Sequence, residues 1–309
     1  MTTDRDFRVA ARLGLVTTLL VYGLLVIGSV VRTTGSGLAC PDWPLCEGRL
    51  IPRFEFHVLV EWFHRLVALL ASLLVLATAA WVWRGRATRA RLGGLAALAV
   101  ALLVTQVLLG ALTVWKLLSP AVVSSHLAVA LLLFGTLLTL TLVAGAEDRP
   151  AALTGGAIAP GPLGLLGLTA ALAYGQCLLG ALVSTTHAGL ACSDWPTCNG
   201  EWFPPLRGAV GLQMIHRYGA YLLTAVVLFT AARTRAAGEP VVRAAGGMAA
   251  GLTLLQVGIG VATVVLGVPP WASALHLANA AGLFALLLAA TCREALARAP
   301  RARLAPGTP

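Results

Sequence analysis

The chain has 309 residues, of which 58% are hydrophobic and only 11% are charged, and its formal net charge is +10. This balance excludes an ordinary soluble domain and predicts a protein embedded in a membrane. The positive charge requires no nucleic-acid partner, because basic residues beside membrane spans contact anionic lipid at the cytoplasmic surface.

Eight hydrophobic segments follow one another along the chain, each near the length of about 20 residues that crosses a bilayer as a helix. They are residues 11–31, 58–83, 93–115, 121–145, 163–183, 210–232, 245–266 and 271–291. We expect the first segment to be retained, because it is too long for a signal peptide and resembles its repeat partner. The predicted fold class is an all-α membrane protein with eight transmembrane helices.

Arginines mark the ends and connections that the orientation rule assigns to the cytoplasm. With the N-terminus inside, every second connection is also inside, and most of the arginines lie there. They are Arg5, Arg8, Arg12, Arg84, Arg86, Arg89, Arg91, Arg149, Arg233, Arg235, Arg243, Arg293, Arg298, Arg301 and Arg303. We therefore expect both termini in the cytoplasm and the remaining loops outside, where disulfides form.

One passage occurs twice, as LACPDWPLC at residues 38–46 and as LACSDWPTC at residues 190–198. The correspondence continues into the hydrophobic segments that follow. A repeat of about 150 residues is too long for a solenoid unit and indicates a tandem duplication. We expect two pseudo-symmetric four-helix bundles, formed by residues 1–150 and 151–309.

Each repeated passage carries two cysteines, and the predicted orientation places all four outside. Each pair closes a short loop around an Asp-Trp-Pro turn, so a disulfide within each loop is the expected pairing. The pairs are Cys40 with Cys46 and Cys192 with Cys198. A zinc site is the alternative, but it needs about four ligands.

Four histidines lie inside the hydrophobic segments, His64 and His126 in the first half and His216 and His276 at the corresponding positions of the second. All four belong to even-numbered segments and lie at similar depths below the outer ends. Ionisable side chains within a membrane are costly and usually functional. Paired histidines on facing helices of a bundle are typical of haem ligation. Other metal sites, or plain packing, are the alternatives.

Charged neighbours of these histidines distinguish the halves. Arg65 and Arg217 each follow a histidine, where a guanidinium can pair with haem propionates or, alternatively, reach lipid headgroups. Glu61 shares a helix face with His64, whereas Gln213 takes that position in the second half. Glu61 is a candidate proton relay, with a structural ion pair to arginine as the alternative. The difference indicates that the first half is reactive and the second holds a permanent cofactor.

A further pattern on the odd-numbered segments places a glycine four residues after a glutamine. It comprises Gln106 with Gly110, Gln176 with Gly180 and Gln256 with Gly260, and Gly28 corresponds to Gly180. Glycine permits close helix approach, and glutamine can form a hydrogen bond across it. We expect helix packing at these positions rather than chemistry.

Over residues 10–292 the chain resembles the haem A synthase family. The resemblance rests on the Glu61-x2-His64-Arg65 motif, His126, His216-Arg217, His276 and the outer-loop cysteine pairs, of which Cys40 and Cys46 match a pair implicated in activity. It implies oxidation of one methyl group of haem O to a formyl group, by two successive hydroxylations and loss of water. The product would be haem A for cytochrome oxidase.

The resemblance also implies roles for individual residues. His216 and His276 would ligate a resident haem b, and His64 and His126 would hold the substrate haem O beside the catalytic Glu61. Haem O synthase and cytochrome oxidase assembly factors are the expected partners, besides membrane lipid. A bacterial cell membrane is the expected location.

Two other functions remain open from the residues alone. A quinol-oxidising cytochrome b would carry two tightly bound haems of one type and would give Glu61 no catalytic task. A haem transporter or chaperone would need an open path and exchangeable ligands in both halves. Neither would make a formyl product.

Overall fold

In this computed structural model, which describes residues 2–149, 161–236 and 239–298, eight long helices follow one another. They are α1 Thr2–Thr33, α2 Phe56–Arg84, α3 Arg86–Trp115, α4 Pro120–Asp148, α5 Leu163–Thr185, α6 Gly208–Ala236, α7 Pro240–Val265 and α8 Pro270–Arg298. All eight are long and apolar enough to cross a membrane. The predicted all-α, eight-span fold class is therefore confirmed. The expected boundary at 150–151, Arg301 and Arg303 lie outside the described residues.

The helices extend past the predicted hydrophobic segments, mainly at the arginine-bearing end. Helix α1 begins at Thr2, where the sequence predicted a start near residue 11, and α3 begins at Arg86 instead of near 93. A helix satisfies its own backbone hydrogen bonds, so it can continue into water beyond its apolar stretch. Helices α4 and α8 begin at Pro120 and Pro270, where a missing backbone N–H costs no helical hydrogen bond.

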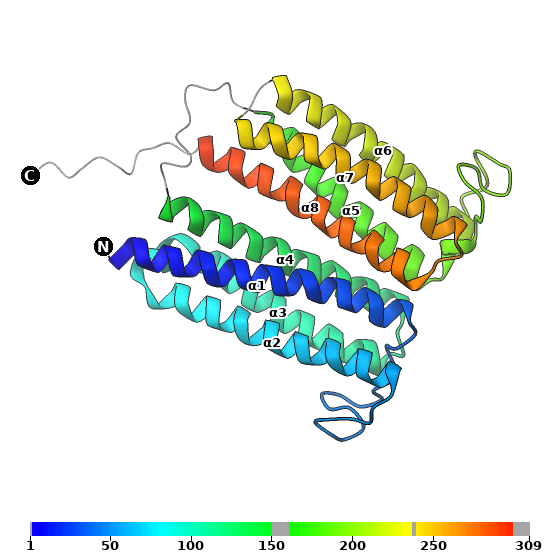
Figure 1. Cartoon of the computed structure of the whole chain (residues 1–309), viewed down its shortest axis with the longest axis horizontal. Coiled ribbons are helices and arrows are strands. Elements are labelled where there is room, and N and C mark those ends of the chain that lie inside the picture. Colours follow the sequence, from blue (N-terminus) through cyan, green and yellow to red (C-terminus); the bar gives the residue numbers. More distant parts are fainter. Residues whose placement is uncertain (1, 150–160, 237–238, 299–309) are drawn as a thin grey trace, which may run out of the picture.

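Figure 1 shows α1–α4 lying together on one side of the molecule and α5–α8 on the other. The two groups of helices meet through α1 and α4 of the first half and α5 and α8 of the second. Buried side chains from both groups form one continuous apolar core between them. Helix α1 begins and α8 ends at one end of the molecule, and the two cysteine-containing loops lie at the opposite end.

Equivalent contacts recur in the two halves. Buried threonine pairs join the first two helices of each half, and a tyrosine hydroxyl donates to a backbone carbonyl of the other half. The contacts are Thr17–Thr78 (3.1 Å), Thr169–Thr230 (2.8 Å), Tyr22 to Ala278 O (3.0 Å) and Tyr174 to Ala128 O (3.4 Å). A duplicated sequence predicts such pairs, and the duplication itself stays an inference from sequence.

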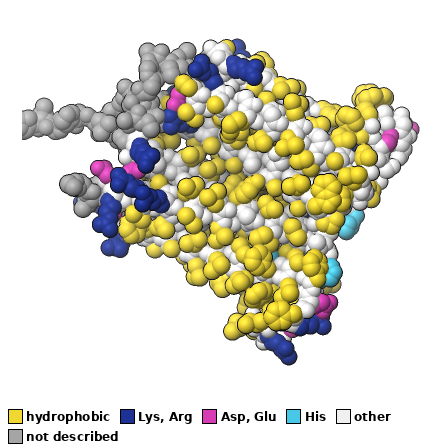
Figure 2. All heavy atoms as spheres, in the orientation of Figure 1, with side chains coloured by type: hydrophobic (Ala, Val, Ile, Leu, Met, Phe, Trp, Pro, Cys, Tyr) yellow, Lys and Arg dark blue, Asp and Glu magenta, His cyan; other side chains and the backbone are white. Residues whose placement is uncertain are grey.

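Basic side chains gather at the end where α1 begins, while the middle of the visible face is apolar (Figure 2). Ion pairs tie helix ends together there: Arg8 Nε lies 3.1 Å from Asp148 Oδ1, and Arg91 Nε lies 2.6 Å from Glu147 Oε1. The apolar middle and the charged end are the pattern expected of a protein that crosses a bilayer.

Candidate functional site

The outer loops are closed by disulfides within each loop, Cys40–Cys46 and Cys192–Cys198, as the sequence predicted. An aspartate side chain in each loop accepts hydrogen bonds from backbone N–H groups of the same loop. Asp42 accepts the backbone N–H groups of Glu47 (2.6 Å) and Gly48 (2.7 Å). These hydrogen bonds, foremost that from Gly48, lower the pKa of Asp42.

The loop of the second half is built in the same way around Asp194. Its carboxylate accepts the backbone N–H groups of Asn199 (2.7 Å) and Gly200 (3.0 Å) and, in addition, the Thr197 hydroxyl (2.6 Å). The threonine hydrogen bond is the largest of the causes that lower the pKa of Asp194. The two aspartates therefore hold their loops in the same way, and Asp194 has one additional hydrogen-bond donor.

Arg65 binds the first loop from α2 below it. Its Nη1 donates to the carbonyls of Asp42 (2.6 Å) and Leu45 (2.5 Å), and its Nη2 donates to Cys40 O (2.9 Å). A guanidinium that satisfies three loop carbonyls is a strong positional restraint on that loop. The expected pairing of Arg65 with a propionate stays a prediction.

Arg217 has the same structural role in the second half. It is buried on α6, where Nη1 donates to Thr197 O (2.6 Å) and Nη2 donates to Cys192 O (2.7 Å). Arg65 and Arg217, which each follow an intramembrane histidine, thus both hold a disulfide loop in place over the helices. A contact of Arg217 with a propionate likewise stays a prediction.

Glu61 links the first disulfide loop to the helix that carries His64. Its side chain is buried, Oε1 lies 2.6 Å from Arg65 Nη2, and Oε2 accepts the Cys40 N–H at 2.9 Å. The corresponding Gln213 is equally buried, but its Oε1 has no hydrogen-bond partner among the described residues. The ion pair between Glu61 and Arg65, which was the structural alternative to a catalytic role, is present. The catalytic role of Glu61 stays a prediction.

All four intramembrane histidines line a single cavity of about 1170 Å³ that extends through both halves. His216 and His276 face each other with ring centroids 6.4 Å apart. Two imidazoles this close on facing helices could both reach one iron porphyrin bound between them. No such ring contact joins His64 to His126 in the described part of the chain.

Each of the four histidine rings rests on a glycine of a neighbouring helix. A Cβ added to the glycine would lie 3.0–3.3 Å from the Cε1 atom of the ring, closer than ordinary packing allows. The pairs are Gly28 with His64, Gly110 with His126, Gly180 with His216 and Gly260 with His276. From the sequence we expected these glycines to serve helix packing. Their matching spacing to the histidines was the signal that they belong to the site.

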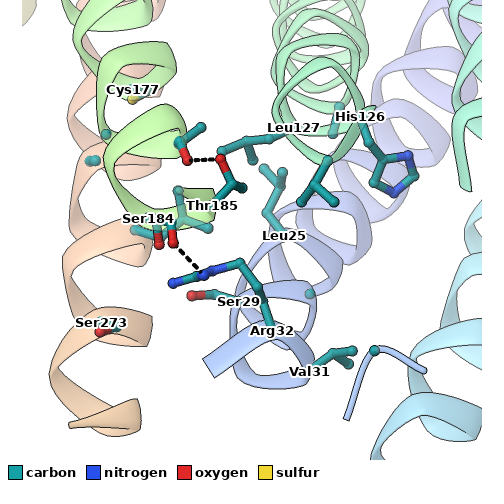
Figure 3. A pocket seen from close by; sticks show the side chains of 18 of the residues that line it. Leu25, Ser29, Val31, Arg32, His126, Leu127, Cys177, Ser184, Thr185 and Ser273 are labelled. Atoms are coloured by element: carbon teal, nitrogen blue, oxygen red, sulfur yellow. Dashed lines mark hydrogen bonds between the residues drawn. The ribbon is translucent and has the colours of Figure 1, made fainter. Parts of the chain in front are cut away.

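Arg32, near the end of α1, lines the cavity; it directly follows the predicted span 11–31, and we expected no role for it from the sequence. Figure 3 shows it extending toward α5, where Nη1 donates to Ser184 O at 2.8 Å. No described carboxylate lies within ion-pair distance of Arg32. The guanidinium is thus available to an anionic group inside an otherwise largely apolar cavity.

The fold and this site define a multi-pass helical membrane protein with paired histidines that face a shared cavity. Comparison with known families identifies it further. The model of the COX15-CtaA family, cytochrome oxidase assembly proteins, matches residues 11–57 and 51–288, and the chain belongs to this family. The family resemblance inferred from the sequence motifs is therefore confirmed.

Curated relatives agree with the family match. A "Heme A synthase" of Symbiobacterium thermophilum is 37% identical over 206 residues, covering 65% of this chain and 67% of the relative. Another, of Shouchella clausii, is 35% identical over 70% of this chain and 73% of the relative. A third, of Methylorubrum extorquens, is 32% identical and covers 93% of this chain and 86% of the relative.

Proposed function

We propose that the chain is a haem A synthase, a membrane oxidoreductase that converts one methyl group of haem O to a formyl group. Two successive hydroxylations turn the methyl into a hydroxymethyl and then a gem-diol, which loses water to leave the formyl group. Each hydroxylation removes two electrons from the carbon and adds one oxygen atom, so it requires either dioxygen with a reductant or water with an electron acceptor as co-reactant. The single observation that carries the proposal is the set of four glycine-backed histidines around one cavity. Membership of the family of the named relatives supports the same activity.

The residues around the cavity suit a porphyrin. Its walls are largely apolar, as a macrocycle requires, and paired imidazoles are the usual axial ligands of iron. The glycines allow helices to approach the rings closely. Arg32 supplies a cation for a propionate at one edge of the cavity. We assign His216 and His276 to a resident haem b, which when bound supplies one-electron redox chemistry.

The first half, residues 1–150, is assigned to the substrate, and the second, residues 151–309, to the resident cofactor. His64 and His126 hold haem O. Glu61 lies one helical turn from His64 and is the one carboxylate among the residues that line the cavity. It can accept a proton at Oε2 when that atom releases the Cys40 N–H, while Arg65 keeps the carboxylate in place.

The basic side chains that gather at the end where α1 begins support an orientation of the chain in the membrane. We assign that end, with both termini, to the cytoplasm and the disulfide loops to the outer face of a bacterial cell membrane. Haem O synthase as the donor of substrate, and cytochrome oxidase assembly factors as acceptors of haem A, are the proposed partners.

The test is analysis of extracted pigments. The chain is expressed together with a haem O synthase in a host that makes no haem A, and the haems are separated and weighed by mass spectrometry. We expect haem A, with the hydroxylated alcohol of haem O as an intermediate. Two haems of one type with no formyl product would instead identify an electron-carrying cytochrome b. Haem O bound but unchanged would identify a transporter.

A further inference from the structure

The cavity extends further in the first half than in the second. Its lining there continues past Glu61, His64 and Arg65 to a group of apolar residues in the disulfide loop, just after it and on α2. They are Pro44, Leu45, Leu50, Trp62 and Leu66. In the register that aligns His64 with His216, the counterparts of all five are described, and none of them lines the cavity. We call the part of the cavity beside these five residues the side extension.

The side extension passes around α2, away from the face that carries His64. Successive residues of an α-helix are about 100° apart, so Leu66, two positions after His64, lies on nearly the opposite side of the helix. On that side Leu69 and Leu70 are exposed, as expected of the outer side of a helix that crosses a membrane. The lining of α6, all of which is described, ends at Tyr221, the counterpart of Leu69. The side extension therefore leads from the histidines of the first half toward lipid.

Larger side chains fill the corresponding place in the second half. Tyr218 stands where the first half has Leu66. Its hydroxyl donates to Trp202 O at 2.8 Å, and its ring centroid lies 6.3 Å from that of Phe203. Met214, one helical turn nearer the loop, is buried in a cluster with the second disulfide. The tyrosine thus ties the loop to α6 and closes the space that is open in the first half.

The first half holds the same loop carbonyl from a different helix position. Leu50 is the counterpart of Trp202, and Leu50 O accepts the Trp62 Nε1–H at 2.8 Å. Trp62 lies one turn nearer the loop than Leu66, so the anchor of the loop is kept while position 66 carries a smaller, wholly apolar side chain. The open space beside Leu66 is therefore compatible with a firmly attached loop.

We propose that the side extension binds a long apolar substituent of the substrate porphyrin, and that Leu50 and Leu66 make the first half selective for porphyrins that carry one. This inference rests on the proposed function, in which the first half holds haem O. Haem O carries a long isoprenoid chain that haem b lacks. Such a chain can follow the apolar side extension from the cavity to lipid without exposure to water. The second half, closed by Tyr218, suits a haem with short substituents.

Binding of the two porphyrins can be compared without following the reaction. Ferric haem O and ferric haem b are titrated separately into the purified protein, and binding is followed by absorbance. Protein with His64→Ala and His126→Ala supplies the signal of the second half, which is subtracted. We expect the first half to bind haem O about tenfold or more tightly than haem b, because each methylene removed from water contributes about fourfold to affinity.

Copying the tyrosine of the second half into the first is the decisive change. Leu66→Tyr should weaken haem O binding in the first half about tenfold and leave haem b binding within about twofold, because only the apolar chain enters the side extension. Leu50→Trp copies Trp202 at an exposed position, so it should fold readily and act in the same direction. Leu70→Tyr is the matched control, since Leu70 lies one turn further along α2, is exposed and does not line the cavity.

The outcomes separate the inference from the function on which it rests. A loss of affinity confined to haem O in the Leu66→Tyr and Leu50→Trp proteins, with Leu70→Tyr unaffected, supports the inference. Equal losses for haem O and haem b, or an unchanged affinity for haem O in both variants, overturn it and assign the side extension to bulk lipid. The synthase proposal then still stands if the native chain forms haem A. A native first half that binds neither porphyrin overturns both.

Discussion

The two halves of the molecule place the same kinds of residue around their histidines and differ in the polar side chains nearby. Both carry a disulfide loop fastened by an arginine and two histidines that rest on glycines. They differ at a few buried polar positions beside those histidines. The comparison teaches that the two halves keep the same arrangement of loop, arginine and histidines and differ in the buried polar side chains near those histidines.

The connection between loop and helix is the clearest single difference. In the first half, Glu61 contacts both the Cys40 N–H and Arg65, so the disulfide loop and the histidine helix are joined through a carboxylate. In the second half, Gln213 lies buried at that place with its Oε1 unsatisfied among the described residues. A buried unpaired oxygen costs about 1–3 kcal/mol. A neutral side chain at this position is thus tolerated at some cost.

The largest effect should come from removing a proposed ligand of the proposed resident haem. In the purified protein we expect His216→Ala or His276→Ala to abolish most of the low-spin b-type spectrum, because iron loses an axial ligand. His64→Ala, the matched change in the first half, should leave that spectrum in place and stop the formation of haem A. A full spectrum in both second-half variants would contradict the assignment of the halves.

Exchanging the side chains of Glu61 and Gln213 tests the difference between the two halves at this position. Glu61→Gln copies the solution of the second half, so expression and the resident haem should be preserved. Haem A should fall at least about 100-fold relative to haem O and its alcohol, because an amide cannot exchange a proton. The measurement is the ratio of the three extracted haems.

Two results would argue against a catalytic Glu61. Haem A at the native level would make the carboxylate dispensable, and loss of the folded protein would make it a structural partner of Arg65. Gln213→Glu provides the matched control. It should leave haem A formation within about twofold of the native level, since the reacting group lies in the other half.

Replacing Arg32 should have a smaller effect, and it tests whether the cavity binds an anionic group such as a haem propionate. Haem release is measured by absorbance as transfer of ferric haem b to excess apomyoglobin. Arg32→Gln removes the described cation of α1 that faces the cavity, so we expect haem to be released about tenfold faster, as for loss of one charge-assisted hydrogen bond. Arg233→Gln, on the exposed side of α6, is the control and should have no effect on release. Equal release rates in the two variants would remove Arg32 from the site.

The glycines under the histidines should have a more modest effect. Gly180→Ala places a Cβ 3.1 Å from His216 Cε1, so the ring must shift, and we expect haem release to accelerate about fivefold. Gly175→Ala on the same helix meets no atom within 4 Å and serves as the control. Faster release in both variants would indicate an effect of helix stiffness instead of contact with the ring.

Most of the fold could be predicted from sequence because each span must be about 20 apolar residues long and the loops repeat their cysteine motif. The positions of His64 and His216 followed from the same repeat. The loop partners of Arg65, unlike its ion pair with Glu61, could not be predicted, because they are backbone carbonyls of a loop whose path the sequence does not reveal.

The side-chain contacts between helices could not be predicted from the sequence either. The spacing of Gln176 and Gly180 was visible, but it indicates only a shared helix face, and the sequence does not say which ring lies opposite. That Gln176 meets His216, and that Gly219 makes room for it, depends on the rotation of α5 against α6. Such rotations are set by packing of many side chains at once, which a local pattern does not encode.

The smallest expected effect concerns acid stability of the two loops. Hydrogen bonds from backbone N–H groups lower the pKa of Asp42, and the Thr197 hydroxyl lowers the pKa of Asp194 further. A lowered pKa in the folded state means that the carboxylate stabilises the loop above the ordinary aspartate pKa of about 3.9, and that this contribution is lost as pH falls through the lowered value. Thermal midpoints of Asp42→Asn and Asp194→Asn should therefore lie below that of the native protein at neutral pH and converge with it on acidification. Convergence should need a lower pH for Asp194→Asn, because its carboxylate has the additional donor. The reverse order would show that the threonine hydroxyl does not distinguish the second loop from the first.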